Sequence, residues 1–472
     1  MEEGRTLPIV WLEQGTSAAR VRALQPTGAS IEDRVRAIIA RVRDGGDAAL
    51  LALSAEIDGV ELAAGGVRVA PDEIAAARAR ADSALLDALT LAARNVERVA
   101  TLALGPEAET VELPQGHRIA VRRLPVRRAG LYVPGGRAAY PSTVVMGAAA
   151  ARAAGVAELV VCVPPGPDGR IADATLAACA LLEVDEVWRV GGAQAIAALA
   201  YGTETLRAVD LIAGPGNRWV QEAKRQVFGH VGVDAVQGPS ELVVLADSDA
   251  DPELVAADLL AQAEHGPDGL VAAVAPEHAW LATLERQLRQ LAAALGGHFE
   301  TPIALCPVAS LEDGLALCEA IAPEHLELVG ARAEPLAAEV RNAGCVFVGA
   351  AAATALGDYV AGSNHILPTG GAARFQSAVS AATFQRRMAT VAIPGRALEE
   401  LARAGALIAR YEGLVAHARS LELRLERARE LDGSSERRES ESERENAHDA
   451  AAPVPSDAEA NARSEPRREV EA

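Results

Sequence analysis

The chain has 472 residues, half of them apolar, and a formal net charge of -20 at pH 7. This length exceeds that at which a single hydrophobic core stops growing, so we expect two or more domains. The negative charge argues against a nucleic-acid surface, which needs clustered Lys and Arg, and no stretch of about 18 residues lacks a charge, so no membrane span is expected. The acidic N-terminus lacks the basic start and long apolar run of a signal peptide, which indicates a cytoplasmic protein.

The five cysteines carry little functional information. They are scattered without paired spacing, at Cys162, Cys179, Cys306, Cys318 and Cys345. A disulfide framework or a cysteine metal site would show such spacing. We therefore expect all five to be buried and reduced.

Strand-like apolar runs alternate with helical patterns through residues 131–227. The expected strands are 131–133, 159–163, 186–190 and 208–213, and the helices begin near residues 142, 171, 194 and 218. This alternation is typical of βαβ units, so a parallel sheet is predicted.

Two glycine-rich turns in this region each follow a strand and precede a helix, namely Gly191-Gly192 and Gly214-Pro215-Gly216. At such a turn, backbone N–H groups and a helix N-terminus can meet a pyrophosphate. The G-x-G-x-x-G fingerprint is missing, however, and glycine turns also serve simply to connect elements. The residues themselves therefore leave cofactor binding open, and they do not distinguish NAD from NADP.

A candidate metal-ligand pair lies at the end of the next helix. Residues 241–246 form an apolar run typical of a buried strand. Asp251 as the cap and Pro252 at the first position then predict a helix that ends at His265. Gln262 and His265 are three residues apart, so an amide oxygen and an imidazole nitrogen leave the last turn on one face. Alone, such a pair is more often part of an ordinary polar surface than a metal site.

The alternation then resumes, with strands expected at 270–274, 303–308, 326–329 and 345–349. A helix is expected at Leu311–Ile321, and Pro323 keeps Ala322 out of helical geometry. Glu324 and His325 should therefore lie on a turn at a sheet edge, where an adjacent carboxylate and imidazole can exchange protons with a substrate.

Two later segments add further polar side chains. A glycine-punctuated loop from Gly357 to His365 includes Asp358, and a helical segment from about Arg396 to Leu425 includes Glu412 and His417. Five residues correspond to about 140° around a helix. The spacing alone therefore does not place Glu412 and His417 in one pocket.

The end of the chain has a different composition. From Leu431 onward there are twelve Asp or Glu against six Arg, without an aromatic residue. Such a segment cannot bury enough apolar area to offset its ordering entropy. We expect residues 432–472 to be a disordered, solubilising tail, with a regulatory or partner-binding role as the alternative.

Several longer motifs, taken in chain order, resemble those of histidinol dehydrogenases. They are GLYVPGGRAAYPS (130–142), VGGAQAIAALAYGT (190–203), IAGPGNRWVQEAKRQV (212–227), GPSELVVLADSDADPELVAADLLAQAEHGPD (238–268) and APEH (322–325). The resemblance covers roughly residues 24–431. It implies an α/β fold with two incomplete Rossmann-like parallel-sheet domains, one inserted in the other, and small helical segments at both ends.

The resemblance also implies a division into domains. These are an N-terminal segment (1–27), a zinc and substrate domain (28–131 and 239–379), an NAD-binding domain (132–238), a helical dimerisation segment (380–431) and the tail (432–472).

The site residues follow from the same resemblance. Zinc, one ion per subunit, would be bound by Gln262, His265, Asp358 and His417. The substrate would contact these four residues together with Ser240, His325 and Glu412. NAD would be bound by Tyr132, Gln194 and Asn217. Two nitrogen and two oxygen ligands suit zinc, although such a set also accepts Mn or Co. In this family the metal binds the imidazole and amine of the substrate and so positions it.

The implied reaction is the four-electron oxidation of L-histidinol through L-histidinal to L-histidine with two NAD, in the last steps of histidine biosynthesis. His325 would take the alcohol proton during the first hydride transfer. Glu324 would deprotonate the water that adds to the aldehyde. A thiohemiacetal on a cysteine is the competing route, but none of the five cysteines lies in the site motifs.

The resemblance further implies a homodimer in which each site takes Glu412 and His417 from the other subunit. From the residues alone, this segment could equally fold back on its own chain. Two alternative functions also stay open: NAD-dependent oxidation of a different primary alcohol, which would not need the imidazole contacts, and a zinc hydrolase, which would not need the glycine turns.

Overall fold

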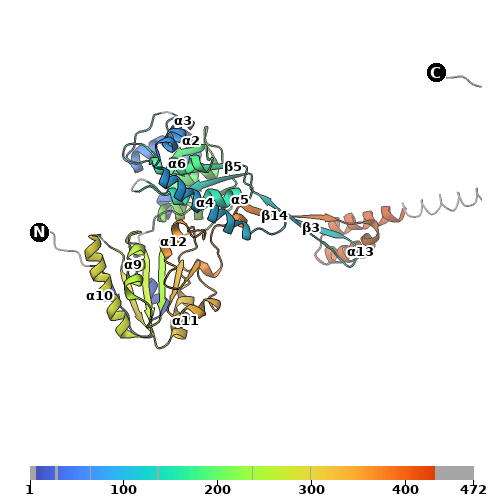
Figure 1. Cartoon of the computed structure of the whole chain (residues 1–472). Helices are drawn as coiled ribbons and strands as arrows, with labels where there is room; N and C mark the ends of the chain where they lie inside the picture. Colours follow the sequence, from blue (N-terminus) through green and yellow to red (C-terminus); the bar gives the residue numbers. More distant parts are fainter. Residues whose placement is uncertain are drawn as a thin grey trace, which may run out of the picture. The chain divides into compact units, whose positions relative to one another are not determined.

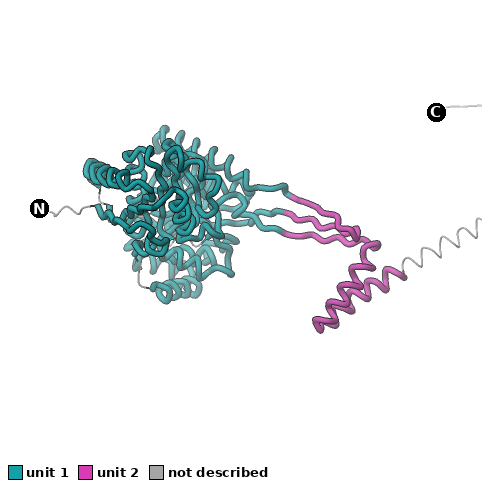
Figure 2. The backbone as a smooth tube through the Cα atoms, turned by 90° about the horizontal axis from the view of Figure 1, so that it is seen from below, with its two compact units in different colours: residues 1–107, 123–387 teal, residues 108–122, 388–472 magenta. Residues whose placement is uncertain are grey.

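The computed structural model describes residues 7–26, 30–63, 65–135, 138–235, 238–297 and 299–430. The chain divides into two compact units (Figure 2). Unit 1 comprises residues 1–107 and 123–387, and unit 2 comprises residues 108–122 and 388–472. In the described part of the chain, no helix is both long enough and apolar enough to cross a membrane.

Unit 1 contains a six-stranded parallel sheet with the strand order β1-β11-β10-β9-β12-β13. Its strands are β1 (Ile9–Trp11), β9 (Glu241–Ala246), β10 (Leu270–Ala275), β11 (Ile303–Pro307), β12 (His325–Val329) and β13 (Cys345–Val348). Helices α9 (Pro252–Ala263) and α10 (His278–Leu295) pack on one face, and α1 (Ala18–Arg22) and α11 (Leu311–Ile321) on the other (Figure 1). Because helices cover both faces, β9 and β10 are buried along their whole length, and all their residues except Glu241 are apolar.

A five-stranded parallel sheet, also in unit 1, has the order β6-β5-β4-β7-β8. Its strands are β4 (Arg128–Tyr132), β5 (Glu158–Val163), β6 (Glu186–Arg189), β7 (Leu211–Ala213) and β8 (Gly232–Val233). One face is covered by α5 (Pro141–Ala153) and α6 (Asp173–Leu181), the other by α7 (Gly192–Tyr201) and α8 (Arg218–Val227). The predicted α/β class with two parallel sheets is therefore confirmed.

Three N-terminal helices pack beside the five-stranded sheet. They are α2 (Glu32–Leu53), α3 (Pro71–Arg80) and α4 (Ser83–Leu102), which contact α7, α6 and α5 respectively. We expected residues 28–131 to belong with residues 239–379 in one domain; the helices of this segment instead share cores with the five-stranded sheet. An amphipathic pattern shows that a helix has an apolar face but not which sheet it covers, and the exact domain boundaries stay a prediction.

A three-stranded sheet, with the order β14-β3-β2, was not expected. It is formed by β2 (Ala108–Glu112), β3 (Arg118–Pro125) and β14 (Gln385–Ala392), and β2 pairs with β3 in antiparallel fashion. Every residue of β2 is exposed, and β14 is largely exposed as well. Such strands lack the buried apolar run by which the other strands were recognised.

The C-terminal helical segment consists of two helices instead of one. Helix α13 (Gly395–Tyr411) is followed by a break at residues 412–414 and by a second helix that is described up to residue 430. Gly413 adopts a φ of 76°, which a continuing helix cannot accommodate. Ala406, Ala409 and Ala418 pack the two helices together. The predicted tail, residues 432–472, lies outside the described residues.

Candidate active site

The candidate catalytic residues lie at the amino-terminal edge of the six-stranded sheet. His325 is the first residue of β12, and Ser240 directly precedes β9, the neighbouring strand. Helix α9 runs back toward this edge, which brings Gln262 in its last turn to the same region. Parallel strands begin at a common edge, so residues far apart in the chain meet there.

The backbone before β12 turns sharply. Helix α11 ends at Ile321, as predicted, and Ala322 then adopts φ 50° and ψ 64°, in the left-handed region. The prediction that Pro323 keeps this residue out of helical geometry is confirmed. His325, however, belongs to β12 and not to the turn, and β12 lies between β9 and β13 inside the sheet.

Glu324 presents a buried carboxyl group to this site. Its Oε2 atom accepts a hydrogen bond from the Ser240 hydroxyl (2.6 Å) and another from the backbone N–H of Glu241 (2.7 Å). Burial raises the pKa of Glu324 to about 8, although both hydrogen bonds act in the opposite direction. A group that changes protonation near neutral pH is suited to act as a general base.

The imidazole of His325 is buried beside this carboxyl group. Its Nδ1 lies 2.9 Å from the backbone oxygen of Glu241, and its Nε2 lies 3.6 Å from Oδ1 of Asp358. Burial lowers the pKa of His325, and the Asp358 carboxylate opposes this effect. A neutral imidazole that donates from Nδ1 to the carbonyl keeps Nε2 free to accept a proton.

Asp358 lies on a short helix, α12 (Thr354–Tyr359), and not on the loop that we predicted. This helix packs against α9. The backbone oxygen of Asp358 is 2.8 Å from Nδ1 of His365, whose Nε2 is 3.1 Å from the hydroxyl of Thr143 on α5. His365 therefore fixes the end of this segment to the helices of the other sheet, a role that the sequence motif did not indicate.

The predicted start of α9 is confirmed: Asp251 caps the helix by accepting from the backbone N–H of Glu253, and Pro252 is its first residue. The helix ends at Ala263, so Gln262 lies in its last turn whereas His265 lies beyond it.

Gln262 and His265 each have a feature that suits a metal ligand. Gln262 is buried, and among the described residues its Nε2 has no hydrogen-bond partner. A half-turn of the amide group places Oε1, the atom that can bind a metal, at this unpartnered position. Nδ1 of His265 lies 3.2 Å from the backbone oxygen of Gln262. Metal-binding histidines commonly donate one ring N–H to a carbonyl and bind through the other nitrogen, so this arrangement fits a metal.

The remaining predicted ligand, His417, belongs to unit 2, as does Glu412. Glu412 is the C-cap of α13 and His417 lies in the following helix, so the angle expected for one continuous helix does not apply. Both side chains are exposed. Within the described ranges, no three His, Cys, Asp or Glu side chains are grouped closely enough to hold a metal ion.

An ion pair that the sequence did not reveal, between the buried Glu241 and the partly exposed Arg22, supports the elements of the site. Glu241 accepts from Nη1 of Arg22 (2.8 Å) and from the backbone N–H of Gly370 (2.9 Å). Arg22 also donates to the backbone oxygen of Ile321, where α11 ends. The pair thereby joins α1, β9 and the turn before β12. No local pattern could reveal it, because its two members come from opposite halves of the chain.

All five cysteines are free, as predicted; four are buried, and Cys345 is partly exposed. Cys345 is the first residue of β13 and the register partner of His325, so one cysteine does adjoin the site. Burial raises the pKa of Cys345. This disfavours the thiolate that a thiohemiacetal route would need.

The residues predicted to bind NAD lie at the carboxyl edge of the five-stranded sheet. Tyr132 is the last residue of β4, Gln194 lies in the first turn of α7, and Asn217 caps α8 after β7. The strand order reverses between β4 and β7. Ligands of open parallel sheets bind at such a switch point.

Each of these residues also has a partner within the chain. The hydroxyl of Tyr132 accepts from the backbone N–H of Gly192 (3.2 Å), and Asn217 Oδ1 accepts from the backbone N–H of Trp219 (3.0 Å). Gln194 Nε2 donates to Asp58 (3.1 Å), while its buried Oε1 has no partner among the described residues. That oxygen leaves a position open for a ligand, and Asp58 was not anticipated.

The turn after β7 requires glycine. Gly214 has a φ of 121°, and a Cβ atom there would lie 2.0 Å from the backbone oxygen of Tyr132. The glycine turns are thus needed for close packing, whether or not a pyrophosphate binds.

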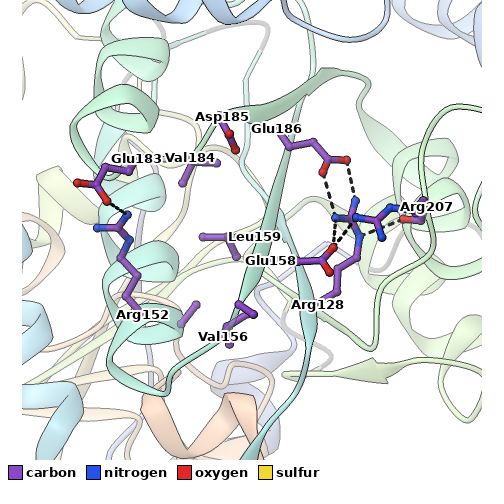
Figure 3. Close-up of a pocket in the computed structure, with 12 residues that line it drawn as sticks. Arg128, Arg152, Val156, Glu158, Leu159, Glu183, Val184, Asp185, Glu186 and Arg207 are labelled. Atoms are coloured by element: carbon purple, nitrogen blue, oxygen red, sulfur yellow. Dashed lines mark hydrogen bonds and ion pairs between the residues drawn. The ribbon is translucent and has the colours of Figure 1, made fainter.

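A separate pocket of about 290 Å³ lies at the amino edge of the five-stranded sheet, opposite the predicted NAD residues (Figure 3). Arg128, at the start of β4, lies between Glu158 (3.1 Å) and Glu186 (2.6 Å). Arg152 pairs with Glu183 at 2.8 Å on the other side. The three arginines of this pocket all pair with its glutamates, so we assign it no ligand.

Comparison with known proteins identifies the family. A family model described as histidinol dehydrogenase matches residues 22–425. The chain is 43% identical over 404 residues to the histidinol dehydrogenase of Gluconobacter oxydans (84% of this chain, 94% of that protein). It is 45% identical over 403 residues to that of a Synechococcus species (83% and 92%).

A solved structure agrees. The crystal structure of histidinol dehydrogenase from Elizabethkingia anophelis superposes with a TM-score of 0.81 at 30% sequence identity and covers 89% of this chain and 98% of that one. The chain therefore belongs to the histidinol dehydrogenase family.

Proposed function

We propose that the protein oxidises L-histidinol through L-histidinal to L-histidine, with zinc as its metal and two NAD as hydride acceptors. The observation that supports this best is the buried pair of Glu324 and His325, each held by hydrogen bonds at the edge of the sheet. An oxidation of an alcohol to a carboxylate needs one base for the alcohol proton and one for water, and this pair supplies both.

In the first oxidation, Nε2 of His325 takes the proton of the substrate hydroxyl. The lowered pKa of the imidazole keeps it neutral, and therefore basic, at physiological pH. Once protonated, the ring carries a positive charge, and the Asp358 carboxylate at 3.6 Å stabilises that charge. The other ring nitrogen stays fixed by the Glu241 backbone oxygen at 2.9 Å.

In the second oxidation, the ionised Glu324 carboxylate removes a proton from the water that adds to the aldehyde. Ser240 and the N–H of Glu241 both bind Oε2. These contacts hold the carboxylate in one orientation, and they favour its ionised form against the effect of burial.

Gln262, His265 and Asp358, together with His417, would hold the zinc ion, and NAD would bind beside Tyr132, Gln194 and Asn217. When bound, zinc would orient the substrate and NAD would accept the hydride. Among the described residues, the unpartnered Oε1 of Gln194 supports the NAD position. The unpartnered end of the Gln262 amide supports the zinc position, because a half-turn of that group brings its oxygen there.

We further propose a homodimer in which unit 2 of one subunit contributes Glu412 and His417 to the site of the other. Unit 2 exposes large apolar side chains close together in the chain: Leu407 (58% exposed), Ile408 (59%), Tyr411 (88%) and Val415 (74%). Monomeric proteins rarely leave such a group uncovered. His417 lies next to this group, so a partner that covers the apolar side chains would also reach the histidine.

The test is to incubate purified protein with L-histidinol, NAD and zinc, follow NADH by absorbance and identify the product. We expect two NADH per histidinol without free aldehyde, and about one zinc per chain by elemental analysis. Formation of one NADH with accumulation of histidinal would contradict the role of Glu324, and full activity in metal-free protein would contradict the role of zinc.

A further inference from the structure

A second polar group, formed by Asp258, Glu327 and Thr354, lies on the elements that carry the site residues. Glu327 accepts a hydrogen bond from Thr354, and the Asp258 charge acts on Glu327. Asp258 precedes Gln262 by four residues on α9, and Thr354 precedes Asp358 by four residues on α12, so each pair shares a helix face.

Glu327 belongs to this group through its strand. It follows His325 by two residues on β12, and alternate residues of a strand point to the same face. The intervening Leu326, and Leu328 beyond, belong to the apolar core on the opposite face. Glu327 therefore faces the same side of the sheet as the catalytic imidazole.

The Glu327 carboxyl group caps α12 from outside that helix. The residue before α12 is Ala353, which has no side chain that could cap it. Oε1 of Glu327 instead accepts from the backbone N–H of Thr354 (3.0 Å) and from its hydroxyl. Both residues are buried, with 2% and 4% of their surfaces exposed.

This arrangement is costly, which argues that it has a use. Burial raises the pKa of Glu327 to about 7 and that of Asp258 to about 6, and the Asp258 charge adds to the shift at Glu327. Oε2 of Glu327 has no hydrogen-bond partner among the described residues. A leucine would fill this part of the core without burying a polar group.

We propose that Glu327 is a positioning residue that fixes α12 to β12 and thereby sets the place of Asp358 relative to His325. The inference rests on the proposed function, in which Asp358 binds zinc. Because a residue that orients a metal ligand commonly changes metal affinity or activity by about 10- to 100-fold when lost, the effect should appear first in zinc binding.

The experiment measures zinc affinity by competition with a chromophoric chelator, alongside kcat, KM and the thermal midpoint. Glu327→Leu leaves the N–H and hydroxyl of Thr354 buried without an acceptor. We expect its zinc affinity to fall about 10- to 100-fold. Glu327→Gln keeps an acceptor oxygen, and its zinc affinity should stay within about threefold of wild type.

Asp247→Leu is the matched control. Asp247 is also buried and accepts from the backbone N–H groups of Ser248 (2.8 Å) and Arg332 (3.3 Å), but it lies at the carboxyl edge of the sheet, just after β9. This variant should lose thermal stability and keep its zinc affinity. An equal loss of zinc affinity in Asp247→Leu and Glu327→Leu would show general destabilisation and overturn the inference.

Unchanged zinc affinity in Glu327→Leu would also overturn it, while leaving the proposed function intact. A wild-type protein that binds no zinc would defeat the proposed function and this inference together. If Glu327→Leu does not fold, Thr354→Val decides: it removes only the hydroxyl, and zinc affinity equal to that of wild type would overturn the positioning role.

Discussion

The two parallel sheets of unit 1 are built alike but place their candidate site residues at opposite edges. In the five-stranded sheet, Tyr132 and Asn217 follow the carboxyl ends of strands, at the switch point where ligands of such sheets usually bind. In the six-stranded sheet, Ser240 and His325 lie at the amino ends. For the six-stranded sheet, the switch-point rule alone would have pointed to the edge opposite the candidate site residues.

In each sheet, the opposite edge is closed by bonds within the chain. At the carboxyl edge of the six-stranded sheet, Asp249 accepts from the backbone N–H of Ala331 (3.2 Å). At the amino edge of the five-stranded sheet, Arg128 is held between two glutamates. The edges with candidate site residues instead contain buried polar atoms without partners, at Gln262 and Gln194. The unpartnered atoms at Gln262 and Gln194 thus support both candidate edges, whereas the switch-point rule supports only that of the five-stranded sheet.

The largest expected effect tests the amino edge of the six-stranded sheet. His325→Asn keeps a polar group but removes the base, so oxidation of histidinol should fall by about 10²- to 10⁴-fold. Oxidation of supplied histidinal should fall much less, because its first proton transfer has been bypassed. Steady-state NADH formation from each substrate measures both effects. Equal losses with the two substrates would contradict the assignment of His325 to the first oxidation and of Glu324 to the second.

The next effect concerns pH. The pKa of Glu324 is raised to about 8, and only the ionised form can accept a proton from water. Oxidation of histidinal should therefore increase about tenfold per pH unit below this pKa and level off above it. Glu324→Gln should abolish this rise and slow the step by about 100-fold or more. A wild-type profile that is flat between pH 6 and 8 would contradict the assignment.

Local sequence patterns predicted the elements of the site well. The cap at Asp251 and the bend before Pro323 depend on a few adjacent residues, and both were correct. The packing of α2 in one core with the five-stranded sheet could not be predicted, because an apolar helix face does not show which sheet it covers. The angle of about 140° between Glu412 and His417 assumed one continuous helix. It does not apply, because Gly413 interrupts the helix between them.

The supporting contacts were out of reach of such patterns. Arg22 and Glu241 are joined only by the tertiary fold, as are Gln194 and Asp58. In the sequence, Glu327 is only one residue of a predicted strand, and nothing there indicates its hydrogen bonds to Thr354. Local patterns can therefore suggest candidate reactive groups, whereas the groups that would position them are found only in the structure.

A third prediction tests whether unit 2 completes the amino-edge site in trans. His265→Asn and His417→Asn should each be inactive. Unfolded and refolded together in equal amounts, they should regain roughly a quarter of wild-type activity, because each mixed dimer then has one intact site under two-fold symmetry. Refolding each variant alone is the control. A mixture that stays inactive would show that His417 acts within its own chain.

A smaller effect is expected at the carboxyl edge of the five-stranded sheet. Gln194→Leu removes the open Oε1 and leaves Asp58 without its donor, so the KM for NAD should rise about tenfold, equivalent to ~1.4 kcal/mol, while zinc content stays the same. Arg152→Ala, at the opposite edge of this sheet, is the matched control and should leave the KM for NAD unchanged. A higher KM for NAD in both variants would mean that any change in this sheet weakens NAD binding, and not only a change at its carboxyl edge.

The smallest expected effect tests whether Cys345 takes part in the second oxidation or only lies beside the site. Cys345 adjoins His325 in the sheet register, and this position alone would suit a thiohemiacetal. Burial raises the pKa of its thiol, however, so little thiolate is present at neutral pH. Cys345→Ala should therefore change the rate of histidinal oxidation by less than about threefold, or ~0.7 kcal/mol of activation free energy. A fall of 100-fold or more in this rate, without a fall in thermal midpoint, would contradict the hydrate route. It would show instead that the second oxidation proceeds through a covalent intermediate on the Cys345 sulfur.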